Sequence, residues 1–212
     1  MVDLSQLRQE YGKLGLSEAD ANTDPIEQFQ NWFHEAVADN LVEPHAMVLS
    51  TVSPESKPSS RVVLLRHVSH EGFTFFTNYL SRKGVELNQN HAASLLFFWG
   101  QLERQVRVEG HIVKTDSSTS DEYFSKRPRD SQLAAVISAQ SKVVESRKVL
   151  EDRMTKLSAE LDGKPVPRPE HWGGYILIPE SIEFWQGRPS RLHDRLRYRK
   201  VNNRWLMERL SP

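Results

Sequence analysis

Three side chains that can carry positive charge alternate near the C-terminus of this chain. Arg191, His193 and Arg195 lie two residues apart, soon after an aromatic segment that contains Trp185. Side chains two apart on an extended strand point to the same side. Such a row is costly to bury unless an anion or an electron-rich ring lies against it. The pattern is typical either of a solvated edge strand or of a site for an anionic ligand that contains a ring.

A second cluster of polar side chains lies where a strand is expected to give way to a helix. Thr77 ends a segment rich in Phe and Thr, and Ser81, Arg82 and Lys83 follow it after a short turn. Free backbone N–H groups at a helix N-terminus attract phosphate, and side-chain cations add to that attraction. The segment is therefore typical of a phosphate site, although a capped surface helix would carry the same residues.

A third cluster surrounds Pro128. Tyr123 and Arg127 precede this proline, and Ser131 follows it. We expect Pro128 to end one helix and Ser131 to cap the next. The intervening turn would then bring together a phenol, a hydroxyl and the two guanidiniums of Arg127 and Arg129, which suits a second phosphate group.

Three further features are weaker on their own. Arg61 and Arg66 stand at the two ends of an apolar strand, where cations usually mark the exit to water. Gln140 and Ser141 lie at the expected start of a long helix, where the helix dipole is positive. Gln105 is an uncharged amide within a strand, and it either faces water or forms a hydrogen bond to a heterocycle.

The composition limits the class of protein. The chain has 212 residues and a mass of 24.5 kDa, which fits one domain with a sizeable core. Lys and Arg (28) balance Asp and Glu (28), so the chain as a whole is not built for a polyanion or a membrane surface. Cysteine is absent, which excludes disulfides and thiolate chemistry. The sequence has neither an apolar run of the ~20 residues that span a membrane nor an apolar signal segment, so we expect a cytoplasmic protein.

Motifs of several other enzyme classes are missing from the sequence. It contains no glycine-rich dinucleotide motif, no P-loop, no serine-hydrolase elbow and no zinc-protease motif. Its eight histidines lack metal-ligand spacing, so no metal site is expected. Two candidate phosphate sites with little acid–base machinery indicate an enzyme whose cofactor performs the chemistry.

The hydrophobic pattern predicts an α+β protein. Residues 1–22 are polar and are expected to form an arm, and residues 23–212 to form a single domain. Closely spaced strands favour an antiparallel sheet closed into a barrel, with helices packed at one side. The expected strands cover residues 46–52, 60–68, 72–77, 94–99, 104–114, 174–179, 182–186, 195–200 and 205–210. Helices after the first are expected at residues 83–90, 117–125, 131–139 and 142–161.

The first helix has clear start signals. Asp24 can cap it, and Pro25 suits its first position. Apolar residues at helical spacing should face the core, and these are Ile26, Phe29, Phe33 and Val37.

Taken in order, the clusters resemble the pyridoxamine/pyridoxine 5′-phosphate oxidases, which use FMN. The resemblance covers nearly the whole chain, from about Leu7 onward. The matching motifs are Arg61-Val-Val-Leu-Leu, Phe-Thr-Asn78 with Ser81-Arg-Lys83, Leu-Glu-Arg-Gln105-Val, Tyr123-Phe with Arg127-Pro-Arg-Asp-Ser-Gln132, Trp172-Gly-Gly-Tyr, and Ile182-Glu-Phe-Trp-Gln-Gly followed by Arg191-Leu-His-Asp-Arg195. Six motifs in register are far more specific than any one of them.

The resemblance implies an FMN-binding split β-barrel that is active as a homodimer with two sites at the subunit interface. It implies that FMN is bound by Arg61, Val62, Val63, Leu64, Leu65, Arg66, Phe76, Thr77, Arg82, Lys83, Gln105, Gln140, Ser141, Trp185 and Arg195. It implies that the substrate is bound by Arg8, Tyr11, Arg66, Tyr123, Arg127, Ser131, Arg191 and His193. Arg191 and His193 would be the catalytic residues, covering the substrate's pyridine ring opposite the flavin.

The reaction implied is the oxidation of pyridoxine 5′-phosphate or pyridoxamine 5′-phosphate to pyridoxal 5′-phosphate. O2 would be the acceptor and H2O2 the co-product. One position departs from the family pattern, because Arg66 stands where Lys is usual. Arginine keeps the charge but is longer and prefers forked contacts, so the departure puts the affinity for substrate in doubt.

Three other functions stay open. A different flavin reductase or oxidase on the same fold would not need the second phosphate cluster. A flavin storage or sensor protein would bind FMN without turnover. A nucleic-acid-binding barrel could use the basic and aromatic C-terminal segment to stack bases and contact phosphates, but the balanced overall charge counts against it.

Overall fold

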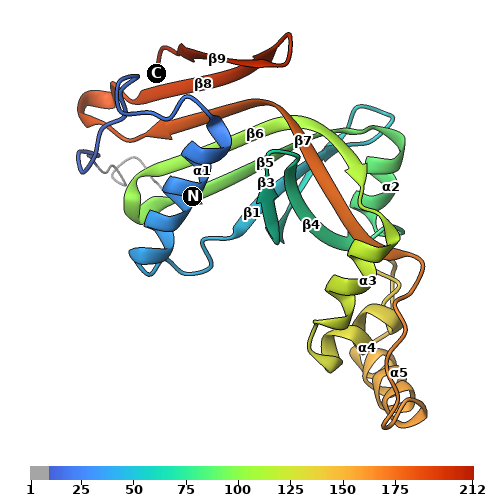
Figure 1. The fold of residues 1–212 in the computed structure, drawn as a ribbon. Helices are drawn as coiled ribbons and strands as arrows, with labels where there is room; N and C mark the ends of the chain where they lie inside the picture. The colour runs from blue at the N-terminus through green and yellow to red at the C-terminus, as the bar shows by residue number, and fades with distance from the viewer. Residues whose placement is uncertain (1–9) are drawn as a thin grey trace, which may run out of the picture.

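A curled antiparallel sheet forms the body of the molecule, and three helices project from one end of it (Figure 1). The structure is a computed structural model and describes residues 10–212. It confirms the predicted α+β class and the split barrel.

The elements follow one another closely along the chain. The helices and 3-10 turns are α1 (Pro25–Ala38), α2 (Arg82–Gln89), η1 (Gly100–Leu102), α3 (Ser117–Ser125), α4 (Arg129–Ile137), α5 (Arg147–Glu160) and η2 (Pro189–Arg191). The strands are β1 (Ala46–Val52), β2 (Pro58–Leu64), β3 (His67–Ser69), β4 (Gly72–Asn78), β5 (Ala92–Trp99), β6 (Arg104–Lys114), β7 (Trp172–Gln186), β8 (Asp194–Val201) and β9 (Arg204–Arg209). The predicted bounds of β1, β6 and α3 are confirmed.

The sheet closes through the chain segment that joins its two edge strands. The strand order β2-β1-β5-β6-β7-β4-β3 begins and ends with strands that are consecutive in sequence. The Leu65 N–H donates to His45 O at 2.8 Å, and the Arg66 N–H donates to Thr74 O at 2.8 Å. The chain thus changes from the β1 side to the β4 side at this corner. The prediction of one strand over residues 60–68 was wrong for that reason.

The long strand β7 replaces two predicted strands. A register shift between Glu109 and Gly110 of β6 lies opposite Pro179, so the chain bends without leaving the sheet. The backbones of β6 and β7 approach each other closely at this point, and the approach requires glycine, because a Cβ at Gly110 would lie 2.0 Å from Ile178 O. One half of β7 pairs with β4 and the other with β8, so the β8–β9 hairpin extends the sheet beyond the barrel.

Aromatic side chains fill the barrel. The Phe29 ring of α1 lies 4.9 Å from the rings of both Phe73 and Phe97, measured between centroids. The predicted start of α1 is confirmed, since Asp24 accepts a hydrogen bond from the Ile26 N–H at 2.7 Å.

The prediction that Val37 faces the core was wrong. The Val37 side chain is 50% exposed, whereas Trp32 and Ala36 are buried. Trp32 packs edge-on against Phe184 of β7 and receives the Arg104 guanidinium 4.2 Å from its ring centroid. The buried face of α1 is therefore rotated toward β6 and β7.

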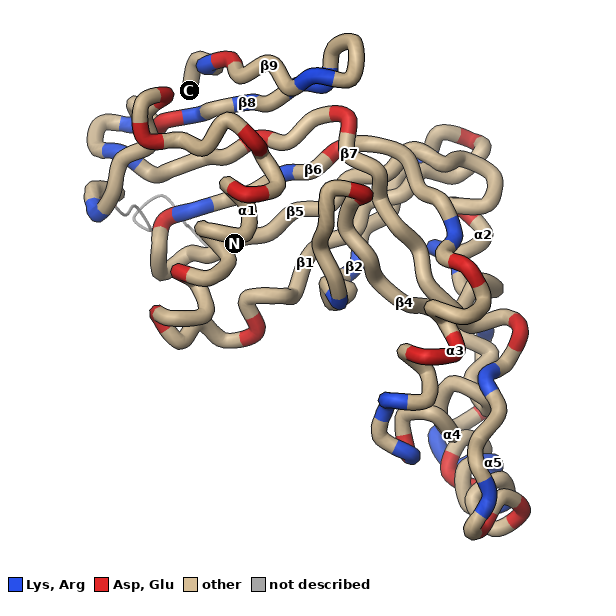
Figure 2. Tube along the Cα trace, viewed as in Figure 1, with Lys and Arg blue, Asp and Glu red and all other residues tan. Residues whose placement is uncertain are grey.

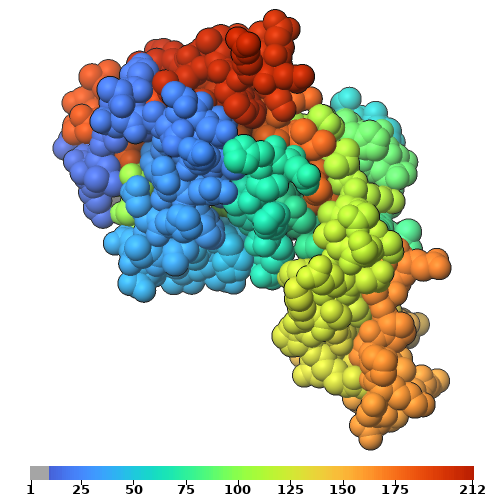
Figure 3. Space-filling view, viewed as in Figure 1, coloured from blue at the N-terminus to red at the C-terminus, as the bar shows by residue number. Residues whose placement is uncertain are grey.

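The part of the chain that holds α3, α4 and α5 projects from the barrel (Figure 3), and a second, smaller core attaches it there. Its buried residues are Phe124, Leu133, Val166 and Trp172. Met154 and Leu157 of α5, and Leu161 at its C-terminal end, pack against them. Trp172 begins β7 and so connects this core directly to the sheet.

Two helix starts differ from the prediction. Ser141 has a φ of 70°, which helical backbone excludes, and α5 begins only at Arg147. Gln140 and Ser141 therefore lie in a loop and not at a helix N-terminus. Pro128 occupies the cap position of α4, so Ser131 lies within the first turn of that helix and does not cap it.

Charges of both signs are interspersed along the chain (Figure 2). Several form exposed ion pairs, such as Arg147 with Glu151 on α5. No helix within residues 10–212 is both long and apolar enough to cross a membrane.

Candidate functional site

A pocket of about 420 Å³ lies between β2, the end of β4 and the helices α3 and α4. The second and third sequence clusters meet in it, together with Arg61, Arg66 and Gln140. The predicted site residues that line it are Arg61, Val62, Val63, Leu64, Arg66, Phe76, Thr77, Lys83, Tyr123, Arg127, Ser131 and Gln140. Segments that are far apart in the sequence thus contribute to one binding site.

Lys83 is a cation of this pocket that is held by three hydrogen-bond acceptors. Its Nζ lies 2.9 Å from Gln140 Oε1, and 3.3 Å from the hydroxyls of both Thr77 and Ser81. Burial lowers the pKa of Lys83 to about 8, and the nearby charge of Arg61 contributes in the same direction. An ammonium group in this position is stabilised by an anion such as phosphate.

A stack of aromatic rings forms the wall near α3. The rings of Phe76 and Tyr123 are parallel, with 4.0 Å between centroids, and Trp172 lies 5.6 Å from Phe76. The Arg127 guanidinium lies 4.6 Å from the Trp172 ring centroid, and the Arg66 guanidinium 5.8 Å from that of Tyr123. Two cations therefore border the same aromatic wall.

Arg127 has a donor without a protein partner. Its Nη1 is buried and makes no hydrogen bond within the described residues. Burial lowers the pKa of Arg127, and the charge of Arg66 adds to this effect. Because an unpaired buried donor is unfavourable, the site fits an anionic ligand that would bind Arg127 and Arg66 together.

Six of the other described site residues form a separate group, which we call the C-terminal group: Tyr11, Gln105, Trp185, Arg191, His193 and Arg195. Gln105, Trp185 and Arg195 are paired in register across β6, β7 and β8. The rings of Tyr11 and His193 lie 5.7 Å and 4.7 Å from that of Trp185. None of the group lines the 420 Å³ pocket.

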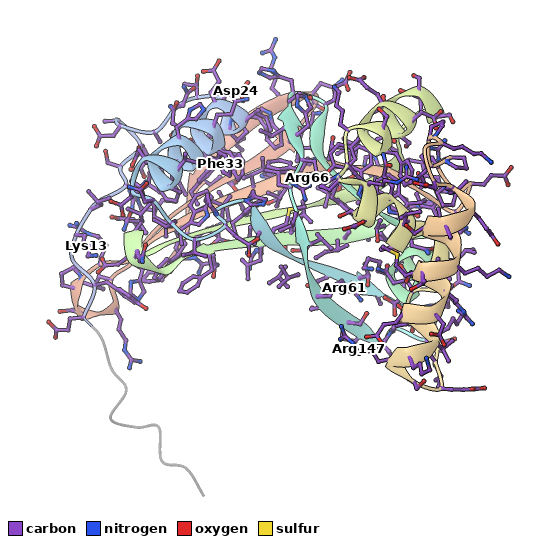
Figure 4. All side chains as sticks on the ribbon, turned by 90° about the horizontal axis from the view of Figure 1, so that it is seen from below. Lys13, Asp24, Phe33, Arg61, Arg66 and Arg147 are labelled. Atoms are coloured by element: carbon purple, nitrogen blue, oxygen red, sulfur yellow. The ribbon has the colours of Figure 1, made fainter. Side chains whose placement is uncertain are left out.

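Within one molecule, the C-terminal group lies apart from the pocket. The arm residue Lys13 shows where the C-terminal group lies, because its backbone N–H donates to Glu103 Oε2 at 3.1 Å, beside the start of β6. Figure 4 shows Lys13 at one edge of the molecule and Arg61 far from it. One chain alone therefore does not bring all the predicted site residues together.

Arg191, His193 and Arg195 do not share one strand, so the alternating row considered from the sequence does not form, while the strand expected at residues 195–200 is present as β8. Ser190 and Arg191 have φ values of 55° and 62°, so the chain turns through η2 and β8 begins only at Asp194. The turn is held by the Arg188 N–H, which donates to His193 Nδ1 at 3.1 Å. Of the three, only Arg195 lies in a strand.

Arg195 is held by groups of its own chain. Its Nε donates to Glu183 Oε1 at 2.7 Å, and its Nη1 donates to Ser211 O at 2.8 Å. Glu183 is buried and also pairs with Arg107. These contacts leave Nη2 of Arg195 as the donor with no protein partner among residues 10–212.

The described part of the arm, residues 10–22, packs on the C-terminal group. The N–H groups of Gly12 and Lys13 donate to Glu103 Oε2 at 2.9 and 3.1 Å, and Leu16 donates to Asp194 Oδ2 at 3.1 Å. These contacts place Tyr11 against Trp185. The predicted substrate residue Arg8 lies outside the described residues.

Besides Gln105, Trp185 and Arg195 of the C-terminal group, three further predicted FMN residues do not line the pocket. Leu65 is buried in the barrel core, and Arg82 and Ser141 lie outside the lining. Two polar groups were not among the predicted site residues, although Asn78 belongs to one of the matching motifs. Asn78 lines the pocket and follows Thr77 directly. Glu86 binds Arg61 and Arg82, and its position four residues after Arg82 was the available signal.

Two family models match this chain. Residues 33–161 match the model described as pyridoxamine 5′-phosphate oxidase, and residues 172–212 match the pyridoxine 5′-phosphate oxidase C-terminal dimerisation region. A protein of Actinobacillus succinogenes named pyridoxine/pyridoxamine 5′-phosphate oxidase is 54% identical over 211 residues, which cover 100% of each chain. A protein of the same name from Cyanothece sp. is 51% identical over 211 residues, which cover 100% of this chain and 99% of the relative.

Solved structures share the fold. The structure of PhzG from Burkholderia lata in complex with tetrahydrophenazine-1-carboxylic acid has a TM-score of 0.90 and 31% identity, covering 95% of this chain and 100% of that one. A pyridoxamine 5′-phosphate oxidase-related, FMN-binding protein from Nostoc punctiforme has a TM-score of 0.69 and 16% identity, covering 87% and 97%. On the evidence of the two family models and of relatives identical at about half of their positions, the chain belongs to the pyridoxamine 5′-phosphate oxidase family of oxidoreductases.

Proposed function

We propose that this protein oxidises pyridoxine 5′-phosphate and pyridoxamine 5′-phosphate to pyridoxal 5′-phosphate, with FMN as its cofactor. The observation that supports this most is the presence of two pairs of cations in one pocket, Arg61 with Lys83 and Arg66 with Arg127. FMN requires one phosphate site, and a phosphorylated substrate requires a second. The buried Nη1 of Arg127, unpartnered in the described chain, suits the second phosphate.

The residues of the pocket divide between the two ligands. FMN would be held by Arg61, Thr77, Lys83 and Gln140. The substrate phosphate would be held by Arg66, Tyr123, Arg127 and Ser131. FMN held there would supply the redox chemistry, accepting a hydride from the substrate's 4′ carbon, with O2 as the final acceptor and H2O2 as the co-product.

The overall reaction balances for both substrates. The alcohol and O2 give the aldehyde and H2O2. The amine also consumes one water and releases ammonia. The chain's own contribution is alignment, because clamped phosphates and a fixed aromatic wall replace a bimolecular encounter with a set geometry.

We infer that a second copy of the chain completes each site. The C-terminal group does not line the pocket of its own chain, and residues 172–212 match a dimerisation region. The outer face of the sheet carries exposed apolar side chains, with Val62 and Phe98 both 65% exposed, and such a face favours burial against a partner. A two-fold homodimer would place the C-terminal group of each chain over the pocket of the other.

In that arrangement Arg191 and His193 would contact the substrate. His193 accepts a hydrogen bond at Nδ1 from the Arg188 N–H, so its neutral ring donates through Nε2. The exposed guanidinium of Arg191 supplies positive charge from the adjoining turn. We assign His193 to orienting the substrate and Arg191 to stabilising negative charge near the reacting carbon.

A second candidate function is the oxidation of a cyclic acid that lacks phosphate. The structure of PhzG, solved with tetrahydrophenazine-1-carboxylic acid, superposes on 95% of this chain. The pair of Arg66 and Arg127 favours a phosphorylated substrate, because a dianion satisfies two guanidinium groups better than a single carboxylate does. Turnover of each substrate class decides between the two functions.

Anaerobic reduction tests the proposed function. Pyridoxine 5′-phosphate is added without oxygen to the FMN-loaded protein while the flavin absorbance is followed. The proposal predicts bleaching that reverses when air is admitted, with pyridoxal 5′-phosphate and peroxide formed. A flavin that stays oxidised with both the alcohol and the amine substrate would contradict it.

A further inference from the structure

Glu86 of α2 is a buried carboxylate placed behind the pocket. It is 5% exposed and is not one of the pocket's lining residues. Its Oε2 accepts hydrogen bonds from Thr51 Oγ1 at 2.5 Å and from Ser59 Oγ at 2.7 Å. The carboxylate therefore joins the helix α2 to the strands β1 and β2.

The same carboxylate binds two arginines from different elements. Oε2 lies 3.4 Å from Nη2 of Arg61 on β2, and Oε1 lies 2.9 Å from Nε of Arg82 on α2. Burial alone would raise the pKa of Glu86, but hydrogen bonds from Thr51, Ser59 and Arg82 outweigh it and lower that pKa to about 2. Glu86 thus stays ionised at neutral pH and holds both guanidinium groups.

Arg61 is fixed in place by this network. Its Nη1 donates to Leu49 O at 3.1 Å and to Thr51 Oγ1 at 2.7 Å, and its Nη2 donates to Ser59 Oγ at 2.5 Å as well as to Glu86. Among residues 10–212 these contacts leave only the Nε–H of Arg61 without a protein partner. A guanidinium held at both terminal nitrogens loses little freedom when it binds a ligand.

We propose that Glu86 is a positioning residue for the phosphate of FMN: it fixes Arg61, which lines the pocket near Lys83, and so organises the phosphate end of the pocket without touching the ligand. This inference rests on the proposed FMN-dependent function. The alternative is that Glu86 only fastens α2 to the barrel. A flavin without a phosphate separates the two roles, because fastening alone affects every flavin equally.

Glu86→Asp is the informative substitution. It keeps the negative charge and shortens the side chain by one methylene, so the carboxylate cannot reach both Arg82 and the hydroxyls of Thr51 and Ser59. Glu86→Gln is less informative. Removing a negative charge near the phosphate strengthens the attraction between FMN and the pocket, and this gain in affinity opposes the loss caused by poorer positioning. Thr51→Val is a second test, since it removes the hydroxyl that Arg61 and Glu86 share.

Glu151→Asp is the matched control. Glu151 pairs with Arg147 four residues before it, as Glu86 does with Arg82. Its ion pair is exposed on α5, and it does not line the pocket.

The full chain and its variants are titrated with FMN and with riboflavin, following flavin fluorescence. We expect Glu86→Asp to weaken FMN binding about tenfold and to leave riboflavin binding unchanged, with Thr51→Val showing the same selectivity and Glu151→Asp no effect. Unchanged FMN affinity in both test variants, or equal weakening of FMN and riboflavin, would overturn the positioning role. If the unsubstituted protein itself binds FMN no better than riboflavin, the phosphate site is wrong, and the proposed function fails together with this inference.

Discussion

The backbone N–H of Arg188 donates a hydrogen bond to Nδ1 of His193 at 3.1 Å. The neutral imidazole therefore carries its proton on Nε2, and its ring lies 4.7 Å from that of Trp185. The side chain that would meet the substrate thus also holds the turn that presents Arg191.

This relationship predicts the tautomer of His193. In protein labelled with 15N at histidine, the Nδ1 signal of the neutral ring should be that of an unprotonated nitrogen. His193→Asn should keep an acceptor near Nδ1 but remove the Nε2 donor, lowering kcat by about tenfold to a hundredfold with FMN affinity unchanged. A protonated Nδ1 in the neutral ring would contradict this account of the turn.

FMN binding should depend on pH through Lys83. Its lowered pKa of about 8 means that the ammonium form predominates below that pH, while a phosphate monoester is a dianion above about 6. FMN affinity should therefore be highest between these values and fall as the pH rises through 8. Lys83→Arg should remove the fall, since arginine stays charged. Titrations with FMN at pH values of about 7 and 9 measure the change in affinity. The same fall in the unsubstituted protein and in Lys83→Arg would assign the effect to another group.

Restoring the usual lysine at position 66 tests the substrate phosphate site. Arg66 lies beside Tyr123, and its charge lowers the pKa of Arg127. A guanidinium fits a tight single-point contact with phosphate less well than an ammonium does. Arg66→Lys should lower KM for pyridoxine 5′-phosphate a fewfold, with kcat little changed. An unchanged KM would show that the arginine already fits the phosphate.

The arm should detach when the space under Tyr11 is filled. A Cβ on Gly187 would lie 2.7 Å from Cβ and Cγ of Tyr11 and 3.0 Å from Cβ of Glu103. Gly187→Ala should speed hydrogen–deuterium exchange in residues 10–16 while the barrel strands exchange as before. The control is Gly12→Ala, whose added Cβ meets Pro189 at an ordinary 3.7 Å. Equal exchange in the two variants would mean that Gly187 does not set the arm's contact.

Much of the fold follows from local pattern. The strands β1 and β6 and the helix α3 have their predicted bounds because alternation, helical spacing and turn residues agree over their whole length. The corner at Leu65 and Arg66 could not be predicted, since nothing local shows that the chain changes partner strands there. The left-handed backbone of Ser141 was equally hidden, because serine has no marked preference for it.

The candidate site could be predicted only as a set of residue types. Tyr123, Arg127 and Ser131 meet in one pocket as expected. The separation of Trp185 and Arg195 from that pocket depends on which end of the sheet each strand reaches, and a pattern along the chain does not give that. Glu86 was missed because its spacing from Arg82 is equally typical of a surface ion pair.

Subunit complementation tests the central claim, that each site joins the pocket of one chain to the C-terminal group of another. Arg127→Ala and Arg191→Ala damage these two parts separately, and each variant homodimer should be nearly inactive with pyridoxine 5′-phosphate. When the two are unfolded together and refolded as a mixture, heterodimers should contain one intact site, restoring about a quarter of the unsubstituted protein's activity. Activity that stays at the level of the separate variants would contradict a site shared between chains.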